Sequence, residues 1–164
     1  MGRLTSLPSA AVTDDSALGG AVIEKSLRFY SPENPYLTRT PSSASNRRTF
    51  TFSCWVRRTK VRWASNSFHS IFGARQSGTT NTDYFLWWNT DELCFTNYNS
   101  TSYDVRTTAK FRDTNSWYHV VVAFDSTQST STDRCKLYIN GTLITAYDTG
   151  TYPPQNTQTA VGAA

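Results

Sequence analysis

WYHVVVAFDSTQSTSTDRCKLYINGTLIT, residues Trp117–Thr145, is the stretch that decides the fold. Apolar side chains recur at every second position through Tyr118–Phe124 and again through Cys135–Ile139, which is the period of a strand with one buried face. A polar loop separates these two runs. Asn140-Gly141 then supplies the two residues that tolerate positive φ in a type I′ turn, so Thr142–Tyr147 is predicted to fold back as a hairpin partner. The stretch therefore predicts three antiparallel strands.

Working outward, residues Arg48–Thr59 are predicted to form the clearest central strand. Its alternation places one set of side chains on one face and the other set on the opposite face. The first set is Phe50, Phe52, Cys54 and Val56, and the second is Thr49, Thr51, Ser53 and Trp55. Further strands are predicted at Ser26–Tyr30, Tyr36–Thr40, Ser67–Ala74, Tyr84–Trp88, Leu93–Tyr98 and Tyr103–Ala109. Short strands at such regular spacing predict an all-β antiparallel β-sandwich or jelly roll.

The composition agrees with an all-β domain. The chain of 164 residues has 19 Ser, 25 Thr and 10 Asn but only three Glu, so residues that favour strands and turns far outnumber strong helix formers. The net charge of +4 fits an ordinary solvated surface, or attraction to an acidic partner. No recognition helix or RNA-binding aromatic signature accompanies the Lys and Arg residues, so no nucleic-acid partner is predicted.

Three widely spaced cysteines, Cys54, Cys94 and Cys135, each lie inside a predicted strand. This pattern favours buried free thiols over a disulfide framework or a zinc site, and it is typical of a reducing compartment. Residues 1–25 are small and polar without alternation, and are predicted to be a docking arm or a linker. No signal peptide and no run of about 20 apolar residues is recognisable, so membrane insertion is not expected.

Five motifs in order carry a resemblance to a known family. SLRF, TFSCWVRR, SIFGAR, SWYHVVVAFD and KLYINGTLI together resemble the laminin G-like and concanavalin A-like β-sandwich domains. The resemblance spans Ser26 to about Tyr152, and it implies a sandwich over residues 26–164. Such domains usually continue with further strands, so the sandwich is expected to be incomplete at the C-terminus. Either a longer chain or a neighbouring subunit would supply the missing strands, which predicts a homo-oligomer.

The front segment, from SLRFYSPENPYLTRT onward, and the TYPPQNTQTAV segment also resemble domains of tailed-bacteriophage virion proteins. This resemblance implies a non-enzymatic structural protein of a virion, as a tail fibre, head appendage or related host-contact component. Residues 1–25 would then dock on other virion proteins, and the sandwich would face outward. The alternative is a carbohydrate-binding adhesion module that recognises glycans on the host surface.

Catalytic residues are not recognisable. Retaining glycosidases on this fold carry paired carboxylates at alternate strand positions, as ExDxxE, but Glu24, Glu33 and Glu92 are far apart and none begins such a motif. His69 and His119 both lie inside predicted strands, where nothing orients them as a base. The chain is therefore predicted not to be an enzyme.

Calcium and sugar binding are the remaining site hypotheses. Domains of this group often bind Ca²⁺ through loop oxygens, here Asn81, Asp83, Asp91, Asp125 and Asp133, but the same residues also form turns, so no metal or other cofactor is assigned. Sugar binding would use exposed aromatic rings beside amides and carboxylates. The candidates are Trp63, Trp88, Tyr98 and Tyr103, with Asn97, Asn99 and Asp104. Trp55 and Trp117 are interpreted instead as packing residues of the core or sheet face.

Overall fold

The computed structural model describes residues 26–29, 35–61, 68–98 and 103–163. The chain divides into two compact units, Met1–Arg39 and Thr40–Ala164. In the first unit, residues 26–29 and 35–39 belong to no strand, so the two strands predicted between Ser26 and Thr40 are wrong over these residues. Their short alternating runs have no sheet partner there, and a strand pattern without a partner does not form a ladder. Residues 1–25, the predicted arm, lie outside the described part of the chain.

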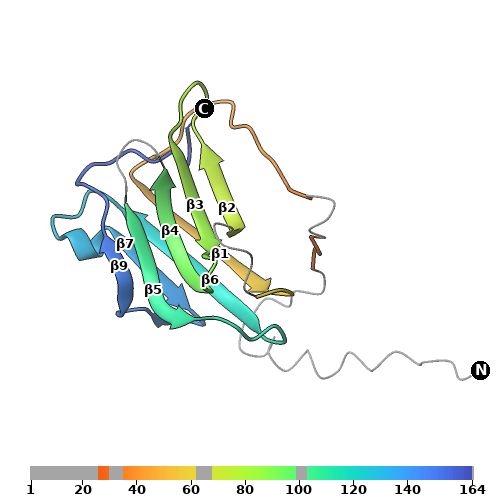
Figure 1. Cartoon of the computed structure of the whole chain (residues 1–164). Helices are drawn as coiled ribbons and strands as arrows, with labels where there is room; N and C mark the ends of the chain where they lie inside the picture. The colour runs from red at the N-terminus through yellow and green to blue at the C-terminus, as the bar shows by residue number, and fades with distance from the viewer. Residues whose placement is uncertain (1–25, 30–34, 62–67, 99–102, 164) are drawn as a thin grey trace, which may run out of the picture. The chain divides into compact units, whose positions relative to one another are not determined.

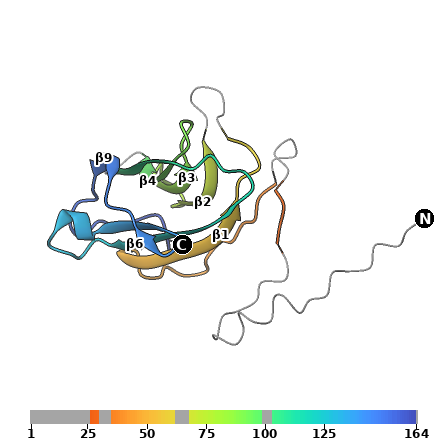
Figure 2. The same cartoon turned by 90° about the horizontal axis from the view of Figure 1, so that it is seen from below.

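The second unit contains two antiparallel sheets, which confirms the predicted all-β sandwich. The four-stranded sheet has the order β1 (Thr49–Arg57), β6 (Trp117–Asp125), β7 (Cys135–Ile139) and β8 (Thr142–Leu143). Among the described strands, β1 is therefore an end strand, and its predicted central position is wrong. The five-stranded sheet has the order β2 (His69–Arg75), β3 (Thr82–Trp87), β4 (Glu92–Tyr98), β5 (Asp104–Lys110) and β9 (Tyr147–Thr151). A single turn of 3₁₀-helix, η4 (Ser131–Asp133), lies in the loop between β6 and β7. Figures 1 and 2 show the two sheets as two layers.

The core lies between the sheets and is built from aromatic and branched side chains. Phe50, Phe52, Cys54 and Val56 of β1 all pack against it, as their alternation predicts. The Phe52 ring stacks on Phe72 of the other sheet with centroids 4.6 Å apart, and Phe50 meets Phe95 edge-on at 6.1 Å. These ring contacts join the two layers directly, because Phe72 and Phe95 belong to the five-stranded sheet. Within its own sheet, β1 pairs with β6 in continuous register from Thr49↔Asp125 to Arg57↔Trp117.

The turn between β7 and β8 has the predicted geometry, since Asn140 and Gly141 have φ of 50° and 79°. The returning strand is shorter than predicted. Strand β8 contains only Thr142 and Leu143, and the Ile144 N–H makes one further bond to the Leu137 carbonyl of β7 at 2.9 Å. By Tyr147 the chain has joined the other sheet as β9, beside β5. Ile144 and Tyr147 both pack against the core. Packing of these two half-buried side chains against the core accounts for the early end of the hairpin.

After β9 the chain continues without a further strand through residues 152–163. This segment is nonetheless bound to the sandwich. The backbone N–H of Asn156 donates to the Ser126 carbonyl at 2.7 Å, that of Thr159 to Arg47 at 3.0 Å, and that of Ser45 to Gly162 at 2.8 Å. Thr159 and Ala160 are buried. Completion of the sandwich by further strands from elsewhere stays a prediction.

The cysteines behave as the sequence predicts. All three are free thiols, with Cys94 and Cys135 buried and Cys54 half-buried. Burial raises the pKa of the Cys54 thiol above its ordinary value. Within the described ranges, no helix has the length and apolar character that crossing a bilayer requires.

Candidate functional site

The outer face of the four-stranded sheet carries exposed aromatic side chains. Trp55 of β1 is 53% exposed and Trp117 of β6 is 44% exposed. Trp55 is the direct cross-strand partner of His119, and their rings stack with centroids 5.1 Å apart and planes 28° from parallel. The stack holds the indole of Trp55 against the sheet and leaves much of its surface open to solvent.

His119 is fixed from both neighbouring strands. Its Nε2 lies in hydrogen-bond contact with Ser53 Oγ at 2.8 Å. Its backbone N–H donates to Asn140 Oδ1 at 2.9 Å, and the Asn140 N–H donates to the His119 carbonyl at 2.8 Å. The turn that closes β7 therefore holds the backbone of His119, while Ser53 and the Trp55 ring contact its imidazole. We define Ser53, Trp55, His119 and Trp117 as the aromatic platform.

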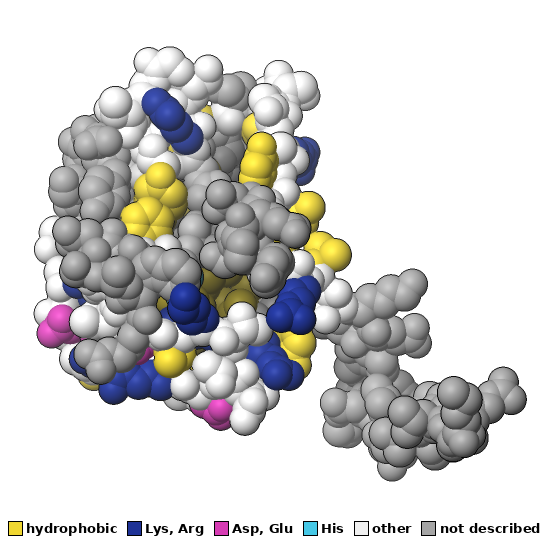
Figure 3. All heavy atoms as spheres, turned by 45° about the vertical axis from the view of Figure 1, so that its right-hand side comes forward, with side chains coloured by type: hydrophobic (Ala, Val, Ile, Leu, Met, Phe, Trp, Pro, Cys, Tyr) yellow, Lys and Arg dark blue, Asp and Glu magenta, His cyan; other side chains and the backbone are white. Residues whose placement is uncertain are grey.

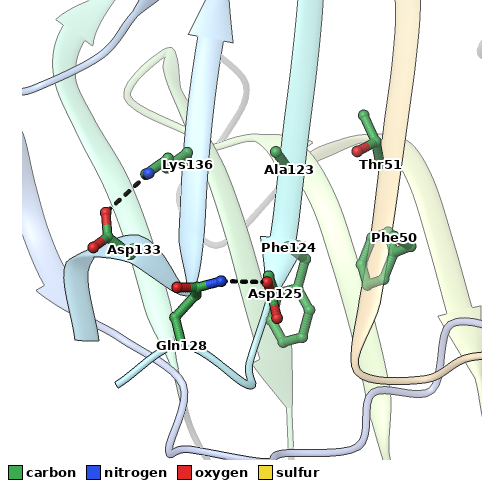
Figure 4. A pocket seen from close by; sticks show the side chains of 8 residues that line it. All are labelled: Phe50, Thr51, Ala123, Phe124, Asp125, Gln128, Asp133 and Lys136. Carbon is green, nitrogen blue, oxygen red and sulfur yellow. Dashed lines mark hydrogen bonds and ion pairs between the residues drawn. The ribbon is translucent and has the colours of Figure 1, made fainter. Parts of the chain in front are cut away.

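Small side chains adjoin the platform on the same face. Thr51 and Ala123 are cross-strand partners in β1 and β6, and Ala123 also pairs with Lys136 of β7. Because these residues are small, the face is hollowed here into a shallow depression of about 380 Å³. Figure 4 shows Ala123 between Thr51 and Lys136. The lining residues are Phe50, Thr51, Ala123, Phe124, Asp125, Gln128, Asp133 and Lys136.

The rim of this depression is polar. Gln128 Nε2 donates to Asp125 Oδ2 at 2.6 Å, and Lys136 Nζ pairs with Asp133 Oδ1 at 2.9 Å, as Figure 4 also shows. Hydrogen bonds from Thr127 and Gln128 hold the pKa of Asp125 below its ordinary value, so it is a carboxylate at neutral pH. The hydrogen bond from Lys136 to Asp133 raises the pKa of the ammonium group.

Platform and depression form one strip along β1 and β6. Thr51 and Trp55 are four residues apart on the same strand, which corresponds to roughly 13 Å at the usual rise of a strand. One end of the strip offers an indole face, and the other offers a carboxylate, an amide and an ammonium group. A ligand with alternating apolar and hydroxylated surfaces could contact both ends.

Two of the sugar-binding candidates from the sequence come together on the outer face of the other sheet. The Arg106 guanidinium lies over the Trp88 ring at 3.9 Å from its centroid, and Arg106 Nη2 pairs with Asp104 Oδ2 at 2.5 Å. The Cys94 thiol donates to Asp104 Oδ1 at 3.0 Å. One face of the Trp88 ring is therefore already covered by the Arg106 side chain. The Asp104 carboxylate already binds both Arg106 and Cys94.

Two further candidates point into the interior. Tyr103 is only 1% exposed and donates its hydroxyl to Asp83, and buried Asn97 donates its amide to the same carboxylate at 2.6 Å. The prediction that Tyr103 presents an exposed ring is wrong. It lies just before β5 with its ring in the core against Phe95, at 5.6 Å between centroids. The ring is therefore buried by packing and has no exposed face on which a sugar could stack.

The remaining candidates are not tested by the structure. Trp63 and Asn99 lie outside the described residues, and the side chain of Tyr98, at the end of β4, is not described either. Conversely, sequence reasoning assigned Trp55 and Trp117 to packing, whereas both are substantially exposed. The signal that could have identified Trp55 is the alternation of side chains along β1, since Trp55 falls on the face opposite to Phe52 and Cys54.

The calcium candidates are spread over the domain. Asp83 is buried and accepts from Tyr103, Asn97 and the Ala160 backbone N–H. Asp91 is buried between Arg58 and Arg112, at 2.9 and 3.0 Å. Within the residues that the structure describes, no group of three or more His, Cys, Asp or Glu side chains is placed to hold a metal ion.

Glu92 is the one glutamate among the residues that the structure describes. It is buried, accepts a hydrogen bond from Thr90, and lies 3.4 Å from Lys110 Nζ. A carboxylate that is held between these partners has a structural role at the β3–β4 turn.

Over the described surface drawn in Figure 3, Lys and Arg side chains are dispersed among hydrophobic and polar ones and do not form one continuous basic stripe.

Comparison with known proteins identifies the domain type. A laminin G-like family model, described as the concanavalin A-like lectin/glucanases superfamily, matches residues 32–164. No match was found among curated proteins.

Proposed function

Because the chain belongs to the concanavalin A-like lectin/glucanases superfamily, we propose that it is a non-catalytic carbohydrate-binding module. Its binding face is the outer face of the four-stranded sheet. One observation carries the proposal: Trp55 is half-exposed and is supported from one side by His119. An exposed indole with a fixed orientation is the kind of group on which the C–H face of a sugar ring stacks.

The polar rim of the depression supports the same proposal. Sugar hydroxyl groups need planar donors and acceptors, and Asp125 and Gln128 supply them beside the small side chains of Thr51 and Ala123. The shallow shape suits a chain of sugar units lying along the sheet, with several modest contacts in place of one deep pocket.

Binding without catalysis is part of the proposal. Glycosidase chemistry needs two carboxyl groups that face each other across the scissile bond. On the proposed face, Asp125 accepts hydrogen bonds from Thr127 and Gln128, and Asp133 is paired with Lys136. Both carboxylates are thus arranged as hydrogen-bonding groups, and release of reducing sugar from oligosaccharides is not expected.

The setting of this module follows from the sequence resemblance to tailed-bacteriophage proteins. We propose that the sandwich acts in a virion, as part of a tail fibre, a head appendage or a related host-contact protein, and that it attaches to glycans of the host surface. Residues 1–25 would then bind other virion proteins. Labelling of virions with an antibody against the sandwich would test this setting separately from sugar binding.

The test of sugar binding is a glycan array probed with the full chain, followed by titration of the best glycan. Trp55→Ala should weaken binding by roughly thirty-fold, as loss of a central tryptophan contact does. Trp88→Ala is the matched control on the other sheet and should bind normally. Loss of binding in Trp88→Ala alone, or no glycan bound by the wild-type chain, would overturn the proposal.

A further inference from the structure

The loop that joins β6 to β7, residues 126–134, carries polar groups of the depression. Gln128 and Asp133 of this rim loop both line the depression, and Gln128 points toward Asp125 (Figure 4). Every side chain from residue 127 to residue 132 is exposed. Apolar packing therefore contributes little to the shape of the rim loop, and hydrogen bonds must hold it. The donors that hold it also decide where the Gln128 amide lies.

The Arg134 side chain binds the rim loop from within. Its Nε donates to the Gln128 carbonyl at 2.8 Å, and its Nη2 donates to the Ser129 carbonyl at 2.7 Å. The backbone of the same residue is bound to β6, since the Asp125 N–H donates to the Arg134 carbonyl at 2.9 Å. A guanidinium group presents its donors in one rigid plane. Arg134 therefore fixes two consecutive carbonyls of the rim loop relative to the sheet.

A third bond from Arg134 leaves the rim loop. Its Nη1 donates to the carbonyl of buried Pro153 at 3.1 Å. Pro153 belongs to the segment after β9, residues 152–163, which we call the strap. The strap also binds the start of the rim loop, because the carbonyl of buried Ser126 accepts from the Asn156 N–H at 2.7 Å. The rim loop is thus bonded to the strap at both of its ends.

The far part of the strap is fixed to the sandwich independently of the rim loop. The Thr159 carbonyl accepts from Arg47 Nε at 2.7 Å, and the Ala160 N–H donates to the buried carboxylate of Asp83. Both strap residues are themselves buried. The strap is therefore a fixed support, and its Pro153 carbonyl is a fixed acceptor for the guanidinium group.

We propose that Arg134 is a positioning residue of the sugar-binding face. It ties the rim loop to the strap and thereby holds the Gln128 amide at the edge of the depression before a sugar arrives. Arg134 does not itself line the depression, so it acts through Gln128. A loop that is already ordered loses less conformational entropy on binding, which strengthens the affinity. This inference rests on the proposed function.

The same bonds link the strap to the bound sugar. If the shape of the rim loop strengthens binding, a bound glycan must in turn stabilise the bonds between loop and strap, because coupling between two sites is reciprocal. The Asn156 N–H reports on these bonds, since its acceptor is in the rim loop. An arginine that only stabilised the fold would produce no such response to the glycan.

The first experiment is a calorimetric titration of the full chain with the glycan that gives the strongest signal on the array. Arg134→Ala should weaken binding roughly ten-fold. Arg134→Lys keeps the charge but lacks the planar fork, so it should also weaken binding. Arg47→Ala is the matched control, because Arg47 binds Thr159 and Gln76, neither of which lines the depression. It should lower stability yet bind with wild-type affinity.

The outcomes of this titration separate the inference from the proposed function. Wild-type affinity in Arg134→Ala, or an equal loss in Arg47→Ala, would overturn the inference and leave the proposed function standing. Full affinity in Arg134→Lys would assign the effect to charge and would also reject the positioning role. No glycan bound by the wild-type chain would overturn the proposed function, and the role of Arg134 in sugar binding with it.

Hydrogen exchange followed by NMR gives a second readout on the full chain. Without sugar, Arg134→Ala should speed exchange of the Asn156 N–H, which bonds to the rim loop, more than that of the Thr159 N–H, which bonds to Arg47. Saturation of the wild-type chain with the same glycan should slow exchange at Asn156. Equal acceleration at the two amides, or no response of Asn156 to the glycan, would contradict the link between strap and sugar site.

Discussion

The outer faces of the two sheets differ in what they expose. On the four-stranded sheet, Trp55 and Leu143 are 53% and 41% exposed. On the five-stranded sheet, Leu86 and Cys94 are fully buried although they do not belong to the central core cluster. Each sheet contains a strand with a continuous apolar run, Val120–Phe124 in β6 and Tyr84–Trp87 in β3. The comparison shows that an apolar run on a sheet does not reveal whether its outer face is covered.

The largest effect expected from this comparison is on stability at Leu86. Leu86→Ala removes a side chain that is fully buried and should lower the free energy of unfolding by roughly 2–5 kcal/mol. Leu143→Ala makes the same chemical change on the open face and should cost within about 0.5 kcal/mol. Urea denaturation of both variants measures the difference. Equal losses would show that the two faces are covered alike.

A smaller effect is expected at the ion pair of the covered face. Asp104→Ala removes the carboxylate that binds Arg106 and accepts from Cys94. Since the Arg106 side chain is mostly buried and its Nε has no partner among the described residues, we expect a loss of about 1–3 kcal/mol. Asp148→Ala, at an exposed aspartate of β9, is the control and should change stability by no more than about 0.5 kcal/mol. Thermal unfolding of the two variants would distinguish them.

The two tryptophans sharpen the comparison further. Trp55→Ala should cost less than about 1 kcal/mol of stability, because its ring is half-exposed. Trp88→Ala should cost roughly 1–2 kcal/mol, because its ring packs under the Arg106 guanidinium. Chemical denaturation followed by circular dichroism avoids the change in tryptophan fluorescence. The reverse order of the two losses would contradict the assignment of the open face.

The smallest effect is expected at Ser53, whose hydroxyl contacts His119 Nε2 on the open face. Ser53→Ala should leave the free energy of unfolding within about 0.5 kcal/mol, yet the imidazole loses a contact that orients it. The measurement is the shift of the His119 ring resonances by NMR, together with the unfolding curve. An unchanged imidazole would show that stacking on Trp55 is sufficient to orient the ring.

Much of the fold could be predicted from the sequence. The parity of β1 and β6, and the turn at Asn140-Gly141, depend on residues close together in the chain and on the strict two-residue period of a strand. The strands predicted in residues 26–40 failed in the described positions, since alternation there finds no partner strand. The early end of the β7–β8 hairpin also escaped prediction, because it depends on where Ile144 and Tyr147 are buried.

The candidate site was predicted only in part. Trp88 and Asp104 do lie together, but the residue that joins them, Arg106, was not recognised, and it covers one face of the Trp88 ring. Tyr103 looked like a candidate platform and instead closes the core. Exposure of a ring depends on which segments pack over it, and these come from distant parts of the chain.

By itself the sequence determined the class of fold, the alternation of its strands, its free thiols and its main turn, because each of these follows from local spacing and side-chain chemistry. Among the described residues, the tertiary structure decided which outer face is open, which tryptophan is exposed and which strands end each sheet. Those properties are set by the order of strands in the sheets and by contacts between residues far apart in sequence. Trp55 illustrates both points. The two-residue alternation of the sequence determines the face of β1 on which it lies, and the packing of the fold determines how far it is exposed.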